Sequence, residues 1–298
     1  MGALQSTPEQ QAPELVGDFD ELIGKVTDVA SLSLINGFEF THAYQPSQSH
    51  TIVQTFTISP RIHPVELAAQ AGERVIPGNY NVFFNGTVSD MEYRVALPLF
   101  GSPNVQLTVP LSKYSKTTLY VDCNLNPSIT GYLKYRGPKI SSEFAFSALN
   151  YFTQGNIVAN FTSKYKKTLY GALIQKSIFS EGYVFRAGCS TDFGKFNDGI
   201  LISLEPKLRI NKSITYSPND DTTGGIQLDI VPSELRAKSA FFINRNFAMS
   251  VFSFNVTSDA TISSSLKRRF GQGYQMTLTS QADIFRKVYN FGLGLVFA

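Results

Sequence analysis

Tryptophan is absent from the sequence, and histidine and cysteine are scarce, with three and two residues. The cysteines, Cys123 and Cys189, are too few for a disulfide framework and lack the spacing of a zinc site. No G-x-S-x-G, H-E-x-x-H or P-loop lysine motif occurs. A serine-histidine-aspartate site would have to use His42, His50 or His63, which all lie near the start of the chain. We therefore expect no enzyme activity, no cofactor and no metal.

Long apolar runs are also absent. No stretch approaches the roughly 18 consecutive apolar residues of a transmembrane helix, and the N-terminus lacks the basic and apolar regions of a secretory signal. Charged residues make up only 16% of the chain. The basic clusters Lys164–Lys167 and Lys267–Phe270 are typical of solvated turns or lipid headgroup contacts. We expect no nucleic-acid partner.

From residue 31 onward, apolar residues recur at every second position. In "MEYRVAL", Met91, Tyr93 and Val95 share one face of a strand, while Glu92 and Arg94 share the other. About 18 or 19 such segments follow one another, many of them close to the ~9–11 residues of a tilted membrane strand. A soluble sandwich also alternates, but here charges at strand centres need water while the other face needs lipid. The pattern favours an all-β transmembrane β-barrel over residues 31–298.

The N-terminal residues differ from the rest. Residues 1–12 are polar and are expected to be disordered. Residues 13–30 predict an amphipathic helix, because Pro13 suits a helix start and apolar residues follow at helical spacing. The apolar stripe consists of Leu15, Phe19, Leu22, Val26 and Val29.

Charge separates this helix from the barrel. Six acidic residues and one lysine give residues 1–30 a net charge of −5, which leaves +8 for the rest of a chain whose total is +3. An acidic helix beside a basic barrel should be attracted to it.

The C-terminal sequence "NFGLGLVF" (Asn290–Phe297) resembles the β-signal that directs assembly of mitochondrial outer-membrane barrels, with Asn290, Gly292, Leu295 and Phe297 at its key positions. Two families of the eukaryotic porin superfamily share this signal: the voltage-dependent anion channel and the pore subunit of the protein-import translocase. Gly37–Ile58, Gly131–Pro138 and Ser258–Phe270 resemble strands of the translocase pore. No segment resembles the anion channel's N-terminal helix.

The resemblance implies a barrel of 19 strands with the N-terminal helix in its lumen. It implies a multi-pass protein of the mitochondrial outer membrane that imports unfolded precursors, with the voltage-dependent anion channel as the alternative. The implied partners are precursors with basic presequences, small single-helix translocase subunits, receptors, membrane lipids and further copies of the barrel.

Acidic side chains are the candidates for guiding a basic presequence. A net charge of +8 on the barrel departs from the cation preference that the family implies. The sequence does not establish that the acids line one path. They are Asp18, Asp20, Glu21 and Asp28 of the helix, and Asp90, Glu92, Asp122 and Glu143 of the barrel.

Overall fold

The computed structural model describes residues 15–35, 37–58, 78–99, 101–123, 127–149, 154–178 and 182–297. The segment expected to be disordered (1–12) and Pro13 lie outside these ranges. The described residues form one 19-stranded sheet, one α-helix and one short 3-10 helix. The helices are α1 (Phe19–Val26) and η1 (Pro232–Glu234), and the strands are β1 (Gly37–Ser47), β2 (His50–Ile58), β3 (Gly78–Val88), β4 (Met91–Pro98), β5 (Asn104–Ser112), β6 (Ser115–Asp122), β7 (Ser128–Arg136), β8 (Ile140–Leu149), β9 (Gln154–Tyr165), β10 (Thr168–Ser177), β11 (Tyr183–Asp192), β12 (Phe196–Glu205), β13 (Lys207–Asn219), β14 (Thr222–Val231), β15 (Arg236–Phe247), β16 (Ser250–Thr257), β17 (Thr261–Arg269), β18 (Tyr274–Asp283) and β19 (Val288–Phe297).

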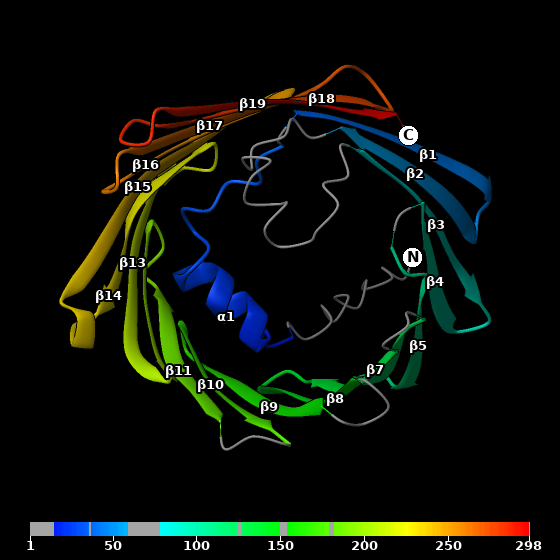
Figure 1. Ribbon diagram of the computed structural model, residues 1–298. Coiled ribbons are helices and arrows are strands. Elements are labelled where there is room, and N and C mark those ends of the chain that lie inside the picture. The colour runs from blue at the N-terminus through cyan, green and yellow to red at the C-terminus, as the bar shows by residue number, and fades with distance from the viewer. Residues whose placement is uncertain are drawn as a thin grey trace, which may run out of the picture.

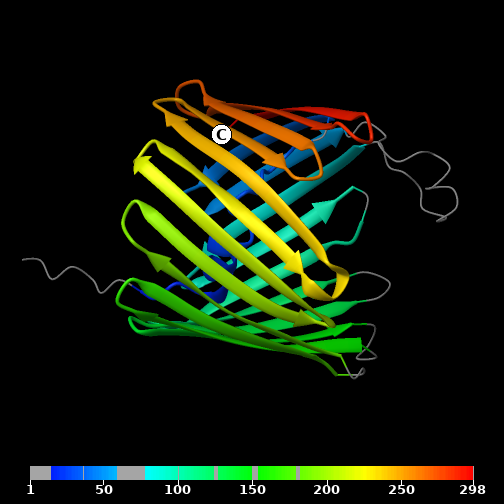
Figure 2. The ribbon, with the colours of Figure 1, turned by 90° about the vertical axis from the view of Figure 1, so that its left-hand side faces the viewer.

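The sheet closes into a barrel (Figure 1). Each strand pairs antiparallel with its neighbours in sequence, and the strands run obliquely to the barrel axis (Figure 2). Because the number of strands is odd, one pair must be parallel. That pair is β1 with β19, in register from Gly37 opposite Gly292 to His42 opposite Phe297. The all-β barrel predicted from the period-two pattern is confirmed.

The two faces of the barrel differ in the way that the alternation predicts. On β19, Tyr289 and Phe291 point outward and are 63% and 70% exposed, whereas Gly292 and Gly294 are buried toward the lumen. Across the barrel, the outer face carries many exposed leucine, isoleucine, phenylalanine and tyrosine side chains. An apolar outer belt of this kind suits a barrel that is surrounded by lipid. No helix in the described part of the chain is long and apolar enough to cross a membrane.

Helix α1 lies inside the barrel, as predicted (Figure 1). It is shorter than the segment 13–30 that the sequence indicated. The Asp18 side chain caps its N-terminus by accepting a hydrogen bond of 2.9 Å from the Glu21 amide. At the other end, the Thr27 hydroxyl donates to the Ile23 carbonyl at 3.0 Å, and residues 27–35 are not helical. Local capping, which the spacing of apolar residues does not show, therefore sets the helix bounds.

Candidate functional site in the lumen

An apolar contact holds α1 against one side of the barrel wall. Phe19, Leu22 and Val26 are fully buried and form one cluster with leucines that β10 and β12 direct inward. The inner wall is otherwise largely polar, so these leucines provide a local apolar surface for the helix. The cluster consists of Val16, Phe19, Leu22, Val26, Leu169, Leu173 and Leu201.

The sequence placed Leu15 in this stripe, and that assignment is wrong. Leu15 precedes the helix and is 40% exposed, whereas its neighbour Val16 is completely buried. Helical spacing does not apply to residues 15–18, because they are not helical. Val16 is instead held by backbone pairing, since its amide donates to the Gly137 carbonyl at 2.9 Å.

A glycine on the wall allows the helix to approach closely. A Cβ atom at Gly171 of β10 would lie 2.8 Å from both Leu22 Cδ2 and Phe19 Cδ2. Gly199 of β12 has the same role, because its Cβ would lie 2.7 Å from Val26 Cγ2. The wall therefore matches the shape of the helix at these two positions.

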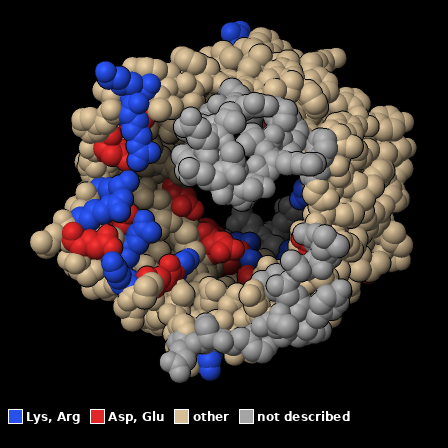
Figure 3. All heavy atoms as spheres, viewed as in Figure 1, with Lys and Arg blue, Asp and Glu red and all other residues tan. Residues whose placement is uncertain are grey.

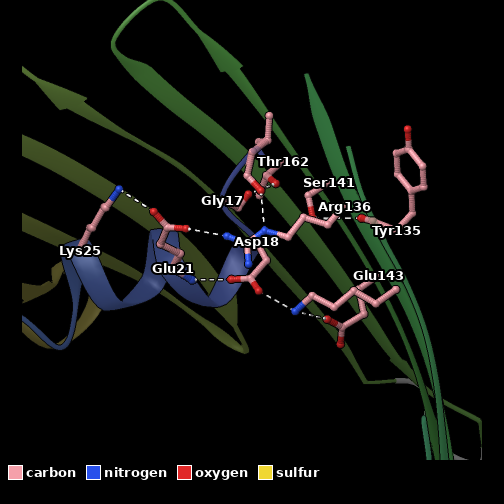
Figure 4. A network of polar contacts seen from close by, with 11 residues as sticks. Gly17, Asp18, Glu21, Lys25, Tyr135, Arg136, Ser141, Glu143 and Thr162 are labelled. Carbon is pink, nitrogen blue, oxygen red and sulfur yellow. Dashed lines mark hydrogen bonds and ion pairs between the residues drawn. The ribbon is translucent and has the colours of Figure 1, made fainter. Parts of the chain in front are cut away.

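Ion pairs hold the beginning of the helix to β7, and one of them extends to β8 (Figure 4). Lys134 Nζ lies 2.5 Å from Asp18 Oδ2 and 3.5 Å from Glu143 Oε2. Arg136 Nη2 lies 3.4 Å from Glu21 Oε2. Burial acts to raise the pKa of Asp18, but the hydrogen bonds from Lys134 and the Glu21 amide bring this pKa below its usual value of 3.8. The attraction expected between acidic helix and basic barrel is thus carried by specific pairs.

Polar side chains of the wall also bind the backbone of the N-terminal segment. Each donates a hydrogen bond to a main-chain carbonyl, and together they follow residues 17–35 from β9 to β18. The donors and acceptors are Thr162 to Gly17 at 2.6 Å, Ser213 to Lys25 at 2.9 Å, Gln227 to Thr27 at 2.5 Å, Asn255 to Ala30, and Thr279 to Ile35 at 2.6 Å. The sequence alone does not identify these five donors. Their inward positions were predictable, but nothing in the alternation shows which polar residue meets the segment.

The candidate acids do not form one path. Asp18, Glu21 and Glu143 lie together, but their charges are taken up by Lys134 and Arg136.

The other candidate acids are placed differently. Asp20 and Asp28 are exposed on the N-terminal segment and form no ion pair within the described ranges. Glu92 lines a separate cavity of about 380 Å³ with Arg94. Asp90 is exposed in the turn between β3 and β4, while Asp122 lies on β6 with a buried Oδ1 that has no hydrogen-bond partner among the described residues.

Most basic residues on the arc of the wall formed by β11 to β15 are in ion pairs with acidic residues. Figure 3 shows acidic and basic side chains interleaved on the side where Figure 1 places β13–β15. A hydrogen bond from Thr257 and the nearby Lys238 bring the pKa of Asp259 to about 2, although burial opposes this. Most of the charge on this arc is therefore held in ion pairs. The pairs are Arg186 with Glu205, Lys207 with Glu234 at 2.7 Å, Arg209 with Asp229 at 2.5 Å, and Lys238 with Asp259 at 3.2 Å.

The residues of the β-signal pattern lie where the barrel closes. Leu295 and Phe297 point outward, and the Phe297 ring lies 5.3 Å from the Phe40 ring of β1. Gly292 faces the lumen, where a Cβ atom would lie 1.8 Å from the Ile35 carbonyl oxygen. Asn290 donates to Gln281 at 3.4 Å. Their role in assembly stays a prediction. Gly292 also leaves room for the Ile35 carbonyl in the lumen, which the β-signal pattern did not indicate.

Comparisons with known proteins give no family. No family model matches the sequence, and no curated protein gives a significant match. A solved structure described as "Asymmetric conductivity of engineered proteins" aligns with 86% of this chain and 95% of its own chain, at 8% identity and a TM-score of 0.46. A likeness of this extent supports no functional conclusion, so function has to be argued from the residues of the lumen.

Proposed function

We propose that the protein is a protein-conducting channel of the mitochondrial outer membrane, through which unfolded precursors with basic presequences pass. The observation that carries the proposal is the distribution of charge in the lumen. Wall cations such as Lys134 and Arg209 are held in ion pairs, while Asp20 and Asp28 of the N-terminal segment are exposed and unpaired among the described residues. Exposed carboxylates beside wall cations that are held in ion pairs favour a basic substrate over small anions.

The chemistry of the inner face supports passage of an extended chain. Short polar side chains such as Thr108, Asn160 and Ser265 line strands between the ion pairs. They offer many weak hydrogen bonds and no single deep binding site. Weak binding at many positions allows a substrate both to enter and to leave. A barrel of 19 strands exceeds the size range of 16–18-stranded porins that enclose an aqueous channel.

The proposal includes partners that would surround the barrel in the membrane. Small single-helix subunits and receptors would bind its outer face and its rims, and further copies of the barrel would join the same complex. The exposed apolar belt is the feature that supports such contacts. Native electrophoresis of the outer-membrane fraction, with the co-migrating subunits identified, tests this part directly.

The test of conduction uses the purified barrel in a planar bilayer. Basic amphipathic presequence peptides should interrupt the current at low concentration, and a scrambled peptide should block less. The double variant Asp20→Asn with Asp28→Asn should weaken the block and flatten its salt dependence. The matched control is Asp220→Asn with Asp221→Asn, which removes two exposed acids from the turn between β13 and β14.

Two results would contradict the proposal. If both double variants weakened the block equally, net charge would explain the effect, and Asp20 and Asp28 would have no special role. If the wild-type pore ignored presequence peptides, preferred anions and closed with voltage, an anion channel would replace the import channel.

A further inference from the structure

Three neighbouring turns at one rim of the barrel carry exposed lysines. The turns connect β7 with β8, β9 with β10, and β11 with β12. Within residues 136–140, 165–168 and 192–196 the only acid is Asp192, whose Oδ1 accepts a hydrogen bond from the Gly194 amide at 2.7 Å. None of the lysines forms an ion pair within the described part of the chain. This lysine cluster consists of Lys139, Lys166, Lys167 and Lys195.

Hydrogen bonds place the three turns side by side. The Ser163 hydroxyl donates to the Lys139 carbonyl at 3.3 Å, which joins the β7–β8 turn to β9. The Asp192 amide donates to the Lys167 carbonyl at 3.0 Å, which joins the β9–β10 turn to β11. The lysine cluster therefore forms one continuous basic surface, on the arc where Figure 1 labels β7 to β11.

The middle of the lysine cluster faces the outside of the barrel. The Thr162 hydroxyl bonds the Gly17 carbonyl in the lumen, so Tyr165, an odd number of residues further along β9, points outward. Tyr165 is 65% exposed, and Lys166 Nζ lies 5.4 Å from the centre of its ring. Lys166 is therefore directed along the outer surface and not into the lumen.

Further aromatic rings mark the depth of this surface in the membrane. Phe193 lies in the same turn as Lys195 and is 64% exposed. Phe196 follows Lys195 directly and stacks on Tyr216, with ring centroids 4.6 Å apart. Exposed aromatic rings near the ends of strands are typical of the membrane interface, where lipid headgroups lie. The lysines therefore lie at the level of the headgroups.

Basic residues in turns at the opposite rim have acidic partners. Lys207 pairs with Glu234 at 2.7 Å, and Arg286 pairs with Asp283 at 3.7 Å. The lysine cluster instead presents four cations that no acid of the described residues neutralises. Such a surface attracts an anionic partner.

We propose that the lysine cluster binds the headgroup phosphates of anionic phospholipids. Each ammonium group has three donors, and phosphate oxygens accept charge-assisted hydrogen bonds, so neighbouring lysines can share one headgroup. Towards the middle of the membrane, the exposed Phe161 and Ile157 continue the outer face of β9 from Tyr165 and provide a surface for acyl chains. The site requires a barrel surrounded by lipid, but it is independent of what the pore conducts.

Other anionic occupants use less of this surface. A soluble anion would contact the lysines but neither the aromatic rings nor the apolar surface next to them. An acidic protein segment would approach from the water, whereas Lys166 lies against an outward-facing ring. An anionic lipid meets the lysines with its headgroup, the rings at the interface and the apolar strand surface with its acyl chains.

Quenching of a fluorophore beside the lysine cluster tests the proposal. The full-length barrel, with Cys123 and Cys189 replaced by serine, carries the fluorophore at Ile140→Cys, which neighbours Lys139 and is exposed. It is placed in bilayers that contain phosphatidylglycerol or phosphatidylcholine with a nitroxide on an acyl chain near the headgroup. Half-maximal quenching should need an about tenfold lower mole fraction of the phosphatidylglycerol. In the variant Lys166→Gln with Lys167→Gln, this preference should fall to about threefold or less.

The matched control is Arg286→Gln with Lys287→Gln, which also removes two positive charges from one turn, at the opposite rim. Lys166 and Lys287 have the same positive φ of 54°, so the two double variants place the same demand on the backbone. The control should keep the preference for phosphatidylglycerol. Circular dichroism establishes that each variant is folded. If Lys166→Gln with Lys167→Gln did not fold, Lys139→Gln with Lys195→Gln would decide, because it removes the other two cations of the cluster.

Four results would overturn the proposal. The first is equal quenching of the wild type by both lipids, and the second is an equal loss of preference in both double variants. The third is a preference that inorganic phosphate removes and sodium chloride of the same ionic strength does not, since the cluster would then bind a soluble anion. The fourth is a polyglutamate peptide that binds the wild type without any lipid preference, since the surface would then fit an acidic protein.

Discussion

The substitution Phe19→Ala should release α1 from the barrel wall without unfolding the barrel. The Phe19 ring is fully buried against wall leucines, and removing a buried phenylalanine ring costs about 3–5 kcal/mol. A loss of about 3 kcal/mol lowers the docking equilibrium constant on the order of 100-fold. The strands keep their own hydrogen bonds, because the helix adds contacts to one arc of the wall only. The N-terminal segment should therefore become mobile inside an intact pore.

Spin labels provide the assay. One label is attached at Gly24→Cys, where a Cβ atom would meet nothing within 4 Å, and the other at Asn244→Cys on the lumen face of β15. Cys123 and Cys189 are first replaced by serine. The distribution of distances between the two labels should be narrow in the barrel that keeps Phe19 and broad in the Phe19→Ala variant.

The matched control is Leu15→Ala. Leu15 is 40% exposed and outside the apolar cluster, so the change should cost less than about 1 kcal/mol and leave the distribution narrow. An unchanged distribution in Phe19→Ala would refute the reasoning, because the apolar cluster would then contribute little to docking. Equal broadening in both variants would also refute it, since exposure would not predict the effect.

Three further outcomes are expected. Gly292→Ala should lower the thermal unfolding temperature more than Thr279→Val, because the new Cβ would lie 1.8 Å from the Ile35 carbonyl oxygen, whereas the valine removes only one hydrogen bond, worth about 1 kcal/mol. Lowering the pH from 7 to 5 should leave the spin-label distance unchanged, because the pKa of Asp18 in the folded protein lies below its usual value of 3.8. The stabilisation that the ionised Asp18 carboxylate provides is fully present above the pKa of the unfolded chain, and it is lost only as the pH falls through the folded pKa. Lys134→Met should broaden the distribution at pH 7, because it leaves the partly buried Asp18 carboxylate unpaired, which screening of an intact pair by salt does not do.

The barrel was predictable because the period-two pattern is a direct consequence of one face meeting water and the other lipid. The helix in the lumen was predictable from the opposite charges of residues 1–30 and the barrel. The helix bounds were not, because they depend on the hydrogen bond from the Glu21 amide to Asp18, which leaves no trace in the apolar spacing. The same holds for Val16, whose burial depends on a backbone contact with Gly137.

Asp198 of β12 and Lys212 of β13 form an ion pair on the outer face of the barrel, and the sequence contained a signal for it that was not used. Lys212 shares its face with Ile210 and Ile214, so the alternation itself places a charge among apolar residues. Its neighbours Asn211 and Ser213 are polar, so residues 211–213 look like an ordinary hydrophilic stretch. Lys212 stands out only when each residue is assigned to the inner or the outer face of the strand. Asp198 could be recognised as its partner only from the register of β12 with β13.

The N-terminal segment is held by two kinds of contact that respond differently to salt. The Asp18–Lys134 ion pair should weaken as ionic strength rises, whereas the apolar cluster around Phe19 and Leu22 should not. The helix therefore stays on the wall at salt concentrations that screen the exposed acids Asp20 and Asp28. A loss of presequence block at high salt then reports screening of those two carboxylates and not release of the helix. The two causes separate in one experiment, because release would broaden the spin-label distance distribution and screening would leave it narrow.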